Sequence, residues 1–465
     1  MDRFELAGFW WLPNKPENKI PGSIKFDPID GITLDLLGSL LEMREMGRVH
    51  NQDIILGVTP DRKLVTAYKC FETGVTYSFP GFPKTSYQAD YLLLGHHFDE
   101  LKDFRFHNFS VNYFLLEKWV GITGFNVQQE FDQERHMVKH NVSYSYPNDL
   151  IVDIDNFKVG LTFHYNSSGV KSHDINLKET TFFTITCDEG ITLNTFLSKF
   201  NYLLQNFITF GFGRPTRSAK ILLKSKEAVE EYPDNKTIQS TIELFFSVNE
   251  LPDLNQEVHP LNILFNLPDI SSEFGLCLKN WFSKEELLRP VLDLYFATLN
   301  SSSMYLNHEF LNITQALESY HRRTRNGEYL SSTIFNPLVE TIVAAIPDDT
   351  PGDLKSSLAQ RLKYGNEFSL RKRLRNILNE LGPLIDPYIR NKEIFVEQVL
   401  STRNYFTHYD KTLEEKALKG EEFYWLTRKL RAILEICLLL ELGISKEKVV
   451  TLLKRNRQYN FLGAH

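Results

Sequence analysis

The hydrophobic period of the chain changes partway along, and this change limits the folds open to it more than any other feature. Up to about residue 250, apolar and polar residues mostly alternate, as in Phe104–Leu116 (FRFHNFSVNYFLL), which is typical of half-buried β-strands. From about Ser283 onward, apolar residues recur every three or four positions, as on one face of an α-helix. A chain of 465 residues is also too long for one hydrophobic core. The sequence therefore predicts a β-rich domain followed by a helical one.

The first part is predicted to be a β domain with a few helices. Two apolar runs flank a Pro-Asp turn in Asp53–Cys70, which predicts a hairpin. Further strands are predicted at 75–79, 104–116, 141–146, 158–169, 180–187, 219–225 and 241–248. Such a series of strands is typical of a sandwich or a barrel. One helix is predicted over Thr192–Gly211 and ended by Gly211, and Asn249–Gly275, rich in Pro, Asn and Asp, is predicted to be a surface connection.

The second part is predicted to be a compact helical bundle. Its first helix would be capped by Ser283, with acidic residues in the first turn. Further helices are predicted near 308–325, 331–346, 353–364, 368–381, 392–407, 421–442 and 446–457. The predicted fold class is α+β multidomain, with a β-rich, sandwich-like or barrel-like domain at 1–280 and an all-α bundle at 283–460.

Composition and charge narrow the classes of partner. The net charge of −7 gives no global attraction to nucleic acid, so any such contact must be local. The four cysteines lie far apart without a C-x-x-C pair, which favours reduced, buried thiols over a zinc site or a disulfide framework. The N-terminus lacks the pattern of a signal peptide, and the most apolar later stretch, Ala432–Gly443, is too short to span a bilayer. We expect a cytoplasmic protein without a membrane partner.

Several motifs favour ordinary structure over chemistry. His136 and His140 have the i, i+4 spacing of a metal site, but their neighbours suggest strand or loop and no H-E-x-x-H pattern is present, so no metal or other cofactor is predicted. The glycines of Phe210–Arg217 lack the spacing of a phosphate loop and are interpreted as a helix end.

Two basic segments leave alternatives open. The first segment ends a predicted helix, and its candidate RNA-binding residues are Arg322, Arg323 and Arg325. The second belongs to a basic amphipathic helix, and its candidates are Arg371 and Arg373. Cations at a helix end or on a solvated helix face are the ordinary interpretation. Two basic helices in one bundle also allow a local patch that binds phosphate. In the second segment the arginines are expected to lie largely off the apolar face.

The segment Ser401–Lys411 (STRNYFTHYDK) places Arg403, Asn404 and His408 near the end of a predicted helix. Arg403 continues an apolar stripe, where an unpaired guanidinium is costly unless it faces a cleft or a partner. Asn404 and His408 are i, i+4 neighbours, whereas Arg403 and His408 are about 140° apart on an ideal helix. The spacing alone is weak, because Arg135 and His140 share it without any expected chemistry.

These residue types suit RNA cleavage. Arginine presents a planar, permanently charged fork that matches phosphate oxygens, and histidine moves protons near neutral pH. No carboxylate cluster of the kind that binds Mg²⁺ accompanies them in the sequence. A reaction without metal would use the ribose 2′-hydroxyl as nucleophile, His408 as general acid or base, and Arg403 to stabilise charge on the phosphate. DNA, which lacks that hydroxyl, should not be cut.

Two resemblances join these observations. Arg403-Asn404-x-x-x-His408 on a late helix of an all-α bundle resembles the HEPN ribonuclease motif, and Gly8–Gly38 resembles the start of ApeA-type N-terminal domains. Together they resemble the ApeA-like HEPN family of bacterial anti-phage defence proteins. The resemblance implies an N-terminal sensor or regulatory domain with a phage-derived trigger and a HEPN homodimer whose two motifs form one cleft. It also implies RNA cleavage that arrests growth on infection (abortive infection), with Glu318 as a supporting residue or a plain surface glutamate.

A non-enzymatic alternative stays open at this point. The bundle could be a dimerisation and binding module that acts as a sensor or scaffold, with Arg403 as a buried structural partner in an ion pair.

Overall fold

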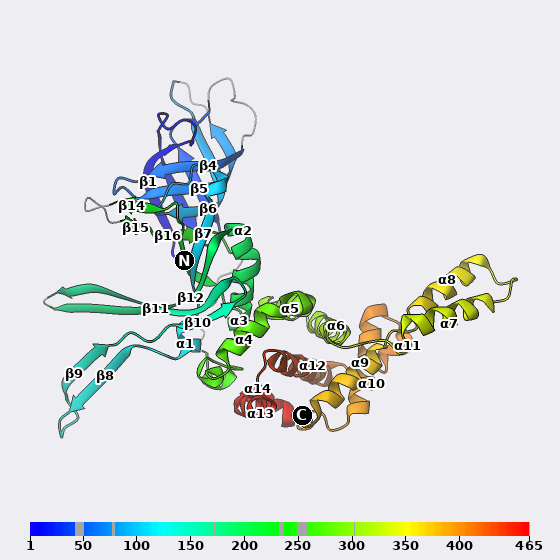
Figure 1. Ribbon diagram of the computed structural model, residues 1–465. Helices are drawn as coiled ribbons and strands as arrows, with labels where there is room; N and C mark the ends of the chain where they lie inside the picture. Colours follow the sequence, from blue (N-terminus) through cyan, green and yellow to red (C-terminus); the bar gives the residue numbers. More distant parts are fainter. Residues whose placement is uncertain are drawn as a thin grey trace. The chain divides into compact units, whose positions relative to one another are not determined.

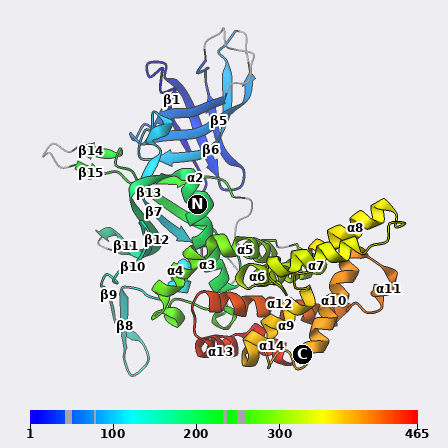
Figure 2. The ribbon, with the colours of Figure 1, turned by 45° about the vertical axis from the view of Figure 1, so that its right-hand side comes forward.

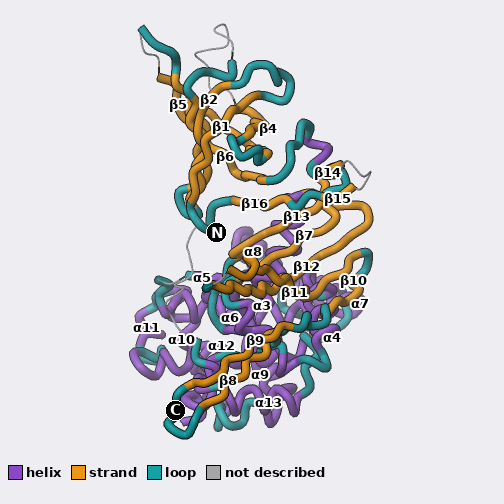
Figure 3. The backbone as a smooth tube through the Cα atoms, turned by 90° about the vertical axis from the view of Figure 1, so that its left-hand side faces the viewer, coloured by secondary structure: helices purple, strands orange, loops and turns teal. Residues whose placement is uncertain are grey.

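A computed structural model of the chain separates into two compact units, which are described one at a time. The structure describes residues 1–41, 51–76, 80–171, 173–231, 237–248, 258–301 and 303–464. The first unit spans 1–257 and 266–269, and the second spans 258–265 and 270–465. Strands dominate the first unit and helices the second (Figure 3). The α+β fold class with a β-rich first part and a helical second part is therefore confirmed, while the boundary near residues 280–283 stays a prediction.

The first six strands form a closed antiparallel barrel (Figure 1). They are β1 (Phe4–Trp11), β2 (Ile20–Asp27), β3 (Gly31–Leu36), β4 (Asn51–Val58), β5 (Leu64–Thr76) and β6 (Lys84–Leu94). The strand order is β6-β3-β2-β1-β4-β5, and pairing of β5 with β6 closes the ring. Closure pairs the first and last strands of this ring, so most of their backbone groups are already hydrogen-bonded within the barrel. The predicted hairpin at 53–70 is confirmed as β4 and β5.

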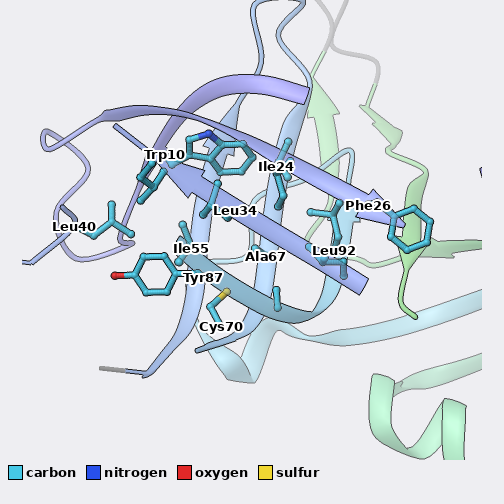
Figure 4. Close-up of a cluster of buried hydrophobic side chains, with 14 of the residues drawn as sticks. Trp10, Ile24, Phe26, Leu34, Leu40, Ile55, Ala67, Cys70, Tyr87 and Leu92 are labelled. Atoms are coloured by element: carbon cyan, nitrogen blue, oxygen red, sulfur yellow. The ribbon is translucent and has the colours of Figure 1, made fainter. Parts of the chain in front are cut away.

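Side chains that point inward fill the barrel, as expected from the alternation along each strand (Figure 4). Trp10, Ile24, Leu34, Ile55 and Tyr87 are all fully or almost fully buried there. The Trp10 ring lies directly against the backbone of Gly57, where a Cβ atom would overlap it. Glycine at this position is therefore a packing requirement of the barrel.

The sheet continues beyond the barrel because β16 (Ile242–Phe245) pairs with the last residues of β6. Beyond it follow β13 (Ser218–Lys224), β7 (Arg105–Tyr113), β12 (Asp174–Thr192), β11 (Phe157–Lys171) and β10 (Leu150–Ile154). Two separate ribbons are formed by β8 (Phe125–Phe131) with β9 (Met137–Tyr144), and by β14 (Val229–Glu231) with β15 (Thr237–Gln239). His136 and His140 belong to the β8–β9 ribbon and its turn, not to a helix.

One helical stretch of the first unit matches the predicted helix. It consists of α2 (Leu193–Thr195), the π-helical η2 (Phe196–Asn201) and α3 (Tyr202–Phe212), and α3 contacts the short helix α1 (Leu116–Val120). The predicted stop at Gly211 is wrong, because Gly211 is buried inside α3. Gly213, with a φ of 69°, ends the helix in the left-handed conformation that glycine adopts easily.

The predicted surface connection at 249–275 is partly wrong. Residues 249–257 lie outside the described residues, as do 77–79 of the predicted strand at 75–79. The rest includes the 3₁₀ turns η3 (Pro260–Asn262) and η4 (Pro268–Ile270) and the start of α4 (Phe274–Ser283). Ile263, Phe265 and Ile270 are buried, so this part contributes to packing although its prolines and polar residues suggest a loop.

The second unit is a helical bundle (Figure 2). After α4 its helices are α5 (Glu285–Asn300), α6 (Leu306–Thr324), α7 (Ser332–Ala344), α8 (Gly352–Lys363), α9 (Leu370–Leu381), α10 (Lys392–His408), α11 (Lys411–Glu414), α12 (Gly420–Glu441), α13 (Lys446–Arg455) and α14 (Arg457–Ala464). Helix α6 contacts α5, α9, α10 and α12, so it lies at the centre of the bundle. The predicted Ser283 cap is wrong: Ser283 ends α4, and Lys284 is the N-cap of α5.

Charged and polar side chains are also built into the bundle core. The Glu309 carboxylate accepts hydrogen bonds from Arg428 and, at 2.6 Å, from Arg431. The Glu435 carboxylate accepts hydrogen bonds from the hydroxyls of Tyr295 and Tyr459. Because every charge here has a partner of opposite charge or a hydrogen-bond donor, its burial is tolerated.

Two further predictions about the chain can be compared with the structure. All four cysteines are free and buried, which agrees with the prediction of buried thiols without a disulfide framework, and burial raises the pKa of the Cys70 thiol. Across the described residues, no helix combines the length and the apolar composition that crossing a membrane requires.

Candidate functional site

Helix α10 places the predicted Arg-Asn-His motif at its C-terminal end. The helix starts at Asn391, whose side chain accepts hydrogen bonds from the backbone N–H groups of Glu393 and Ile394. Its buried stripe consists of Phe395, Val396, Val399 and Thr402. Arg403 is half-buried at the border of this stripe, and the neighbouring Leu400 is only partly buried. The helix ends at His408, because Tyr409 adopts a left-handed backbone conformation with a φ of 50°.

Arg403 lines an open groove between α6 and α10 with a volume of about 490 Å³. The groove is lined by Leu311, Thr314, Gln315, Glu318, Ser319, Arg322, Arg403 and Thr407. Three residues that the sequence predicted as functional, Arg403 and its supporting Glu318, and Arg322 of the basic segment, therefore line the same groove. A groove of this size can hold a phosphate and part of a nucleotide.

The Arg403 guanidinium has no carboxylate within ion-pair distance among the described residues. Its Nη1 donates one hydrogen bond, of 3.3 Å, to the side-chain oxygen of Asn404. A half-buried arginine without a counter-charge is unfavourable in an isolated chain, since its charge is partly desolvated without compensation. The arrangement leaves most of the five N–H donors of Arg403 free to bind an anion.

His408 does not line the groove that contains Arg403. Its side chain is exposed at the helix end, and within the described part of the chain it makes no hydrogen bond. The nearest carboxylate in sequence is Asp410, which caps α11. The pKa of Asp410 is lowered first by the hydrogen bond from the Thr412 backbone N–H, with a smaller contribution from the charge of His408. Within one chain, the structure brings Arg403 and Asn404 together but leaves His408 on a different face.

Glu318 and Arg322 lie one helical turn apart on α6 and form an ion pair of 3.3 Å. Arg322 also pairs at 3.0 Å with Glu367, which follows the α7–α8 hairpin. Both carboxylates hold the Arg322 side chain at the rim of the groove. Arg322 is therefore partly neutralised, and Arg403 is the cation of this groove that lacks a carboxylate partner within the described residues.

The other basic residues proposed from the sequence are tied to the protein itself. Arg323 donates to the backbone carbonyls of Glu286 and Leu287, and Arg325 makes a bidentate pair with Glu380. Arg371 pairs with Glu397 of α10, and this hydrogen bond is the main reason why the pKa of Glu397 is lowered.

The expectation that Arg373 lies off the apolar face of its helix is wrong. Its side chain is 1% exposed and donates a hydrogen bond of 2.9 Å to the Phe368 carbonyl. It also contacts His321, whose pKa is lowered by burial and by the charge of Arg373. Arg373 therefore belongs to the interior of the bundle, where it joins α6 to α9.

Several groove residues were missed by the sequence analysis. Leu311, Thr314, Gln315 and Ser319 precede Arg322 on α6 in the pattern i, i+3, i+4, i+8, i+11, so they share one helix face. That spacing was visible in the sequence and could have identified them once α6 was placed beside α10. The described residues also contain no group of three or more His, Cys, Asp or Glu side chains placed to hold a metal ion.

Both the β-rich part and the helical part of the chain match known protein families. Residues 5–281 match the family described as ApeA N-terminal domain 1, and residues 311–448 match the Apea-like HEPN family. The second match contains α6 from residue 311 onward and the whole of α10, the two helices that line the groove. Searches of curated proteins and of solved structures gave no match.

Proposed function

We propose that this chain, which belongs to the family with an ApeA N-terminal domain 1 followed by an Apea-like HEPN domain, is a metal-independent RNA endonuclease. Membership of that family supports a HEPN-type nuclease that acts in defence. In this proposal it acts in the cytoplasm of a bacterium against phage, by abortive infection. The N-terminal unit senses a phage-derived trigger and holds the nuclease in check until infection.

One observation carries this proposal: Arg403 lines an open groove, and no described carboxylate neutralises it. A phosphodiester would supply the missing counter-charge, since its oxygens match the planar fork of a guanidinium. The same observation weakens the structural alternative, which requires an ion-pair partner for Arg403 in the bundle. A pure dimerisation or scaffold module would have no reason to keep this cation free within a groove.

The chemistry follows from the residues present. The ribose 2′-hydroxyl attacks the adjacent phosphorus, the bond from phosphorus to the 5′-oxygen breaks, and a 2′,3′-cyclic phosphate and a 5′-hydroxyl result. His408 removes the proton from the 2′-hydroxyl or supplies one to the leaving 5′-oxygen. Arg403 binds the phosphate oxygens on which negative charge develops, and Asn404 orients Arg403 through their hydrogen bond. Glu318 supports the site by holding Arg322 at the rim of the groove.

The two key side chains require a second copy of the chain. Five residues apart on one helix, Arg403 and His408 are separated by about 140°, and only Arg403 lines the groove. A homodimer through the HEPN domain, with α10 of one copy facing α10 of the other, would place Arg403 of one copy beside His408 of the next. The proposed partners are therefore RNA and a second copy of this chain.

The direct test is cleavage of RNA by the purified full-length protein in the presence of EDTA. We expect cleavage with 2′,3′-cyclic phosphate ends, no cleavage of the matching DNA, and loss of activity in Arg403→Ala and in His408→Ala. Phage infection of cells that express these variants gives the biological test. Growth arrest that persists in both variants would contradict the nuclease proposal, as would a wild-type protein that cuts RNA only with added metal.

Subunit mixing tests the shared site separately. If each site combines Arg403 of one copy with His408 of the other, a mixed dimer of Arg403→Ala and His408→Ala chains keeps one intact site. Mixing and re-equilibrating the two inactive variants should then restore up to about half the wild-type activity per mixed dimer. If both residues of a site came from one chain, every site in the mixture would carry a substitution and activity would stay absent.

A further inference from the structure

A second cavity of the helical unit contains two cations without counter-charges. It has a volume of about 170 Å³ and lies where α9 and its following turn lead into α10. Arg390 and Lys429 both line it, and none of its lining residues is Asp or Glu. Among the residues that the structure describes, neither cation forms an ion pair. Most basic residues around α9 and α10 are paired, as Arg371 with Glu397 and Lys392 with Asp386.

The two cations disfavour each other. The pKa of Lys429 is lowered by burial and, in addition, by the positive charge of Arg390. Arg390 is exposed and Lys429 is partly buried, so both can reach an anion that enters this open cavity, and such an anion would offset their mutual repulsion. The cavity also adjoins the start of α10, whose N-terminal dipole favours negative charge.

The cavity continues into a neighbouring one of about 340 Å³, with which it shares Phe395, Gln398 and Lys429. Trp425 lines the second cavity and donates its indole N–H to Glu421, so its ring is held in place. Carboxylates of Glu421 and Glu422 line only this second part. A phosphate therefore belongs at the Arg390 end, away from these carboxylates.

An exposed strip of α10 leads from this cavity to His408. Ile394, Gln398, Ser401, Tyr405 and His408 follow each other at spacings of three and four residues, so they lie on one face of the helix. Each of them is at least partly exposed. The strip is about 21 Å long, since it spans fourteen residues at about 1.5 Å each. RNA held at the cavity can therefore extend toward the proposed general acid or base along this face of α10.

We propose that Arg390 and Lys429 form a phosphate-binding subsite that holds the RNA backbone at a distance from the scissile linkage. This inference rests on the proposed function, because RNA is its ligand, but its test measures binding and does not require cleavage. The subsite would fix the position of the strand along α10 and so select which linkage reaches His408.

The test uses the full-length His408→Ala protein, which should bind RNA without cutting it, and a short fluorescein-labelled single-stranded RNA. Fluorescence anisotropy gives Kd over a series of salt concentrations. Adding Arg390→Gln and Lys429→Gln should raise Kd about tenfold at moderate salt. Two lost phosphate contacts should also reduce the slope of log K against log salt by about 1.4. Lys392→Gln is the matched control, because Lys392 lies two residues after Arg390 but is paired with Asp386, and it should change neither quantity.

The same variants separate an RNA-binding subsite from a site for free anions and from a purely structural role. An unchanged Kd and slope in the double variant would overturn the proposal. It would also be overturned if calorimetry with AMP or inorganic phosphate showed binding that depends on Arg390 and Lys429 while RNA binding did not, because the ligand would then be a free nucleotide or anion. A melting temperature several degrees lower in the double variant would count against it too, since removal of mutual repulsion should leave the fold as stable or more stable.

Cleavage measurements keep this proposal distinct from the nuclease proposal. With His408 intact, the variant Arg390→Gln/Lys429→Gln should raise KM about tenfold for RNA and leave kcat close to wild type. If the wild-type protein cuts no RNA at all, the nuclease proposal fails, while the anisotropy result still decides whether the subsite binds RNA.

Discussion

Replacement of Arg403 by alanine should abolish function and leave the fold almost unchanged, which separates a ligand-binding role from a structural one. In the described part of the chain, Arg403 makes one side-chain hydrogen bond, of 3.3 Å, to the neutral Asn404, and no ion pair. Because that bond is long and the side chain is only half-buried, its loss should cost roughly 1 kcal/mol or less. For a unit of this size, that corresponds to a fall in melting temperature of no more than about 2–4 °C.

Arg431→Ala provides the calibration within the same bundle. Arg431 pairs with Glu309 at 2.6 Å, and both side chains are less than 15% exposed. Because Glu309 keeps Arg428 as a partner, loss of the charged hydrogen bond to Arg431 should cost about 1.5–3 kcal/mol, so the melting temperature should fall by roughly 3–12 °C. Thermal unfolding followed by circular dichroism at the helix band reports mainly on the helical unit, because the first unit is mostly strand.

The two variants together decide between the roles of Arg403. A melting temperature that falls as far in Arg403→Ala as in Arg431→Ala would refute the reasoning, because Arg403 would then stabilise the bundle as strongly as a buried ion-pair partner does. A small shift combined with full RNA cleavage would refute it in another way, since the free guanidinium would serve neither folding nor catalysis.

Three further predictions address other parts of the molecule. Burial and the nearby Arg373 lower the pKa of His321 below its usual 6.5, so as pH falls the imidazole is protonated first in the unfolded chain. The free energy of unfolding should therefore be constant above about pH 6.5 and fall below it by up to about 1.4 kcal/mol per pH unit. Denaturant titrations at several pH values should show this dependence, and His321→Gln should reduce it. Gly57→Ala should destabilise the barrel by about 1–3 kcal/mol, because its new methyl group overlaps the Trp10 ring, and tryptophan fluorescence during urea unfolding would show it. Asn366→Ala removes two side-chain hydrogen bonds to the Leu330 backbone and should speed hydrogen exchange in the α7–α8 hairpin while α12 keeps its protection.

The sequence predicted the types of the elements better than their ends. Long periodic segments such as Lys392–His408 and Gly420–Glu441 were located to within one or two residues, because burial of one helix face fixes the pattern over many turns. Ends depend on single capping residues, which explains the errors at Gly211 and Ser283. The short helices α4 and α14 were missed, since a few residues carry too little periodicity to stand out.

The candidate site was predictable in part, for a similar reason. Residue type and position on α10 were enough to select Arg403, and a family resemblance joined it to Glu318, which lines the same groove. The sequence could not tell which cations would be free, because pairing is decided by tertiary contacts. Arg373 illustrates this limit: its neighbours in sequence indicate a solvated basic helix, but the bundle buries it under His321 and Phe368.

The distribution of paired and free cations bears on how a chain with a net charge of −7 could bind RNA at all. Counterion release, which drives much of nucleic-acid binding, depends on cations that neutralise phosphates, and a guanidinium already held by a carboxylate contributes less. Basic residues counted along the sequence would place the RNA on α9, yet Arg371 and Arg375 of that helix are paired with Glu397 and Glu393 of α10. In the described part of the chain, the cations that line the two cavities without an ion pair are Arg403 in the groove between α6 and α10, and Arg390 with Lys429 in the second cavity. If RNA binds this protein, its path should therefore follow the outer face of α10, and charge-removing substitutions on α9 should weaken binding less than those at Arg390 and Lys429.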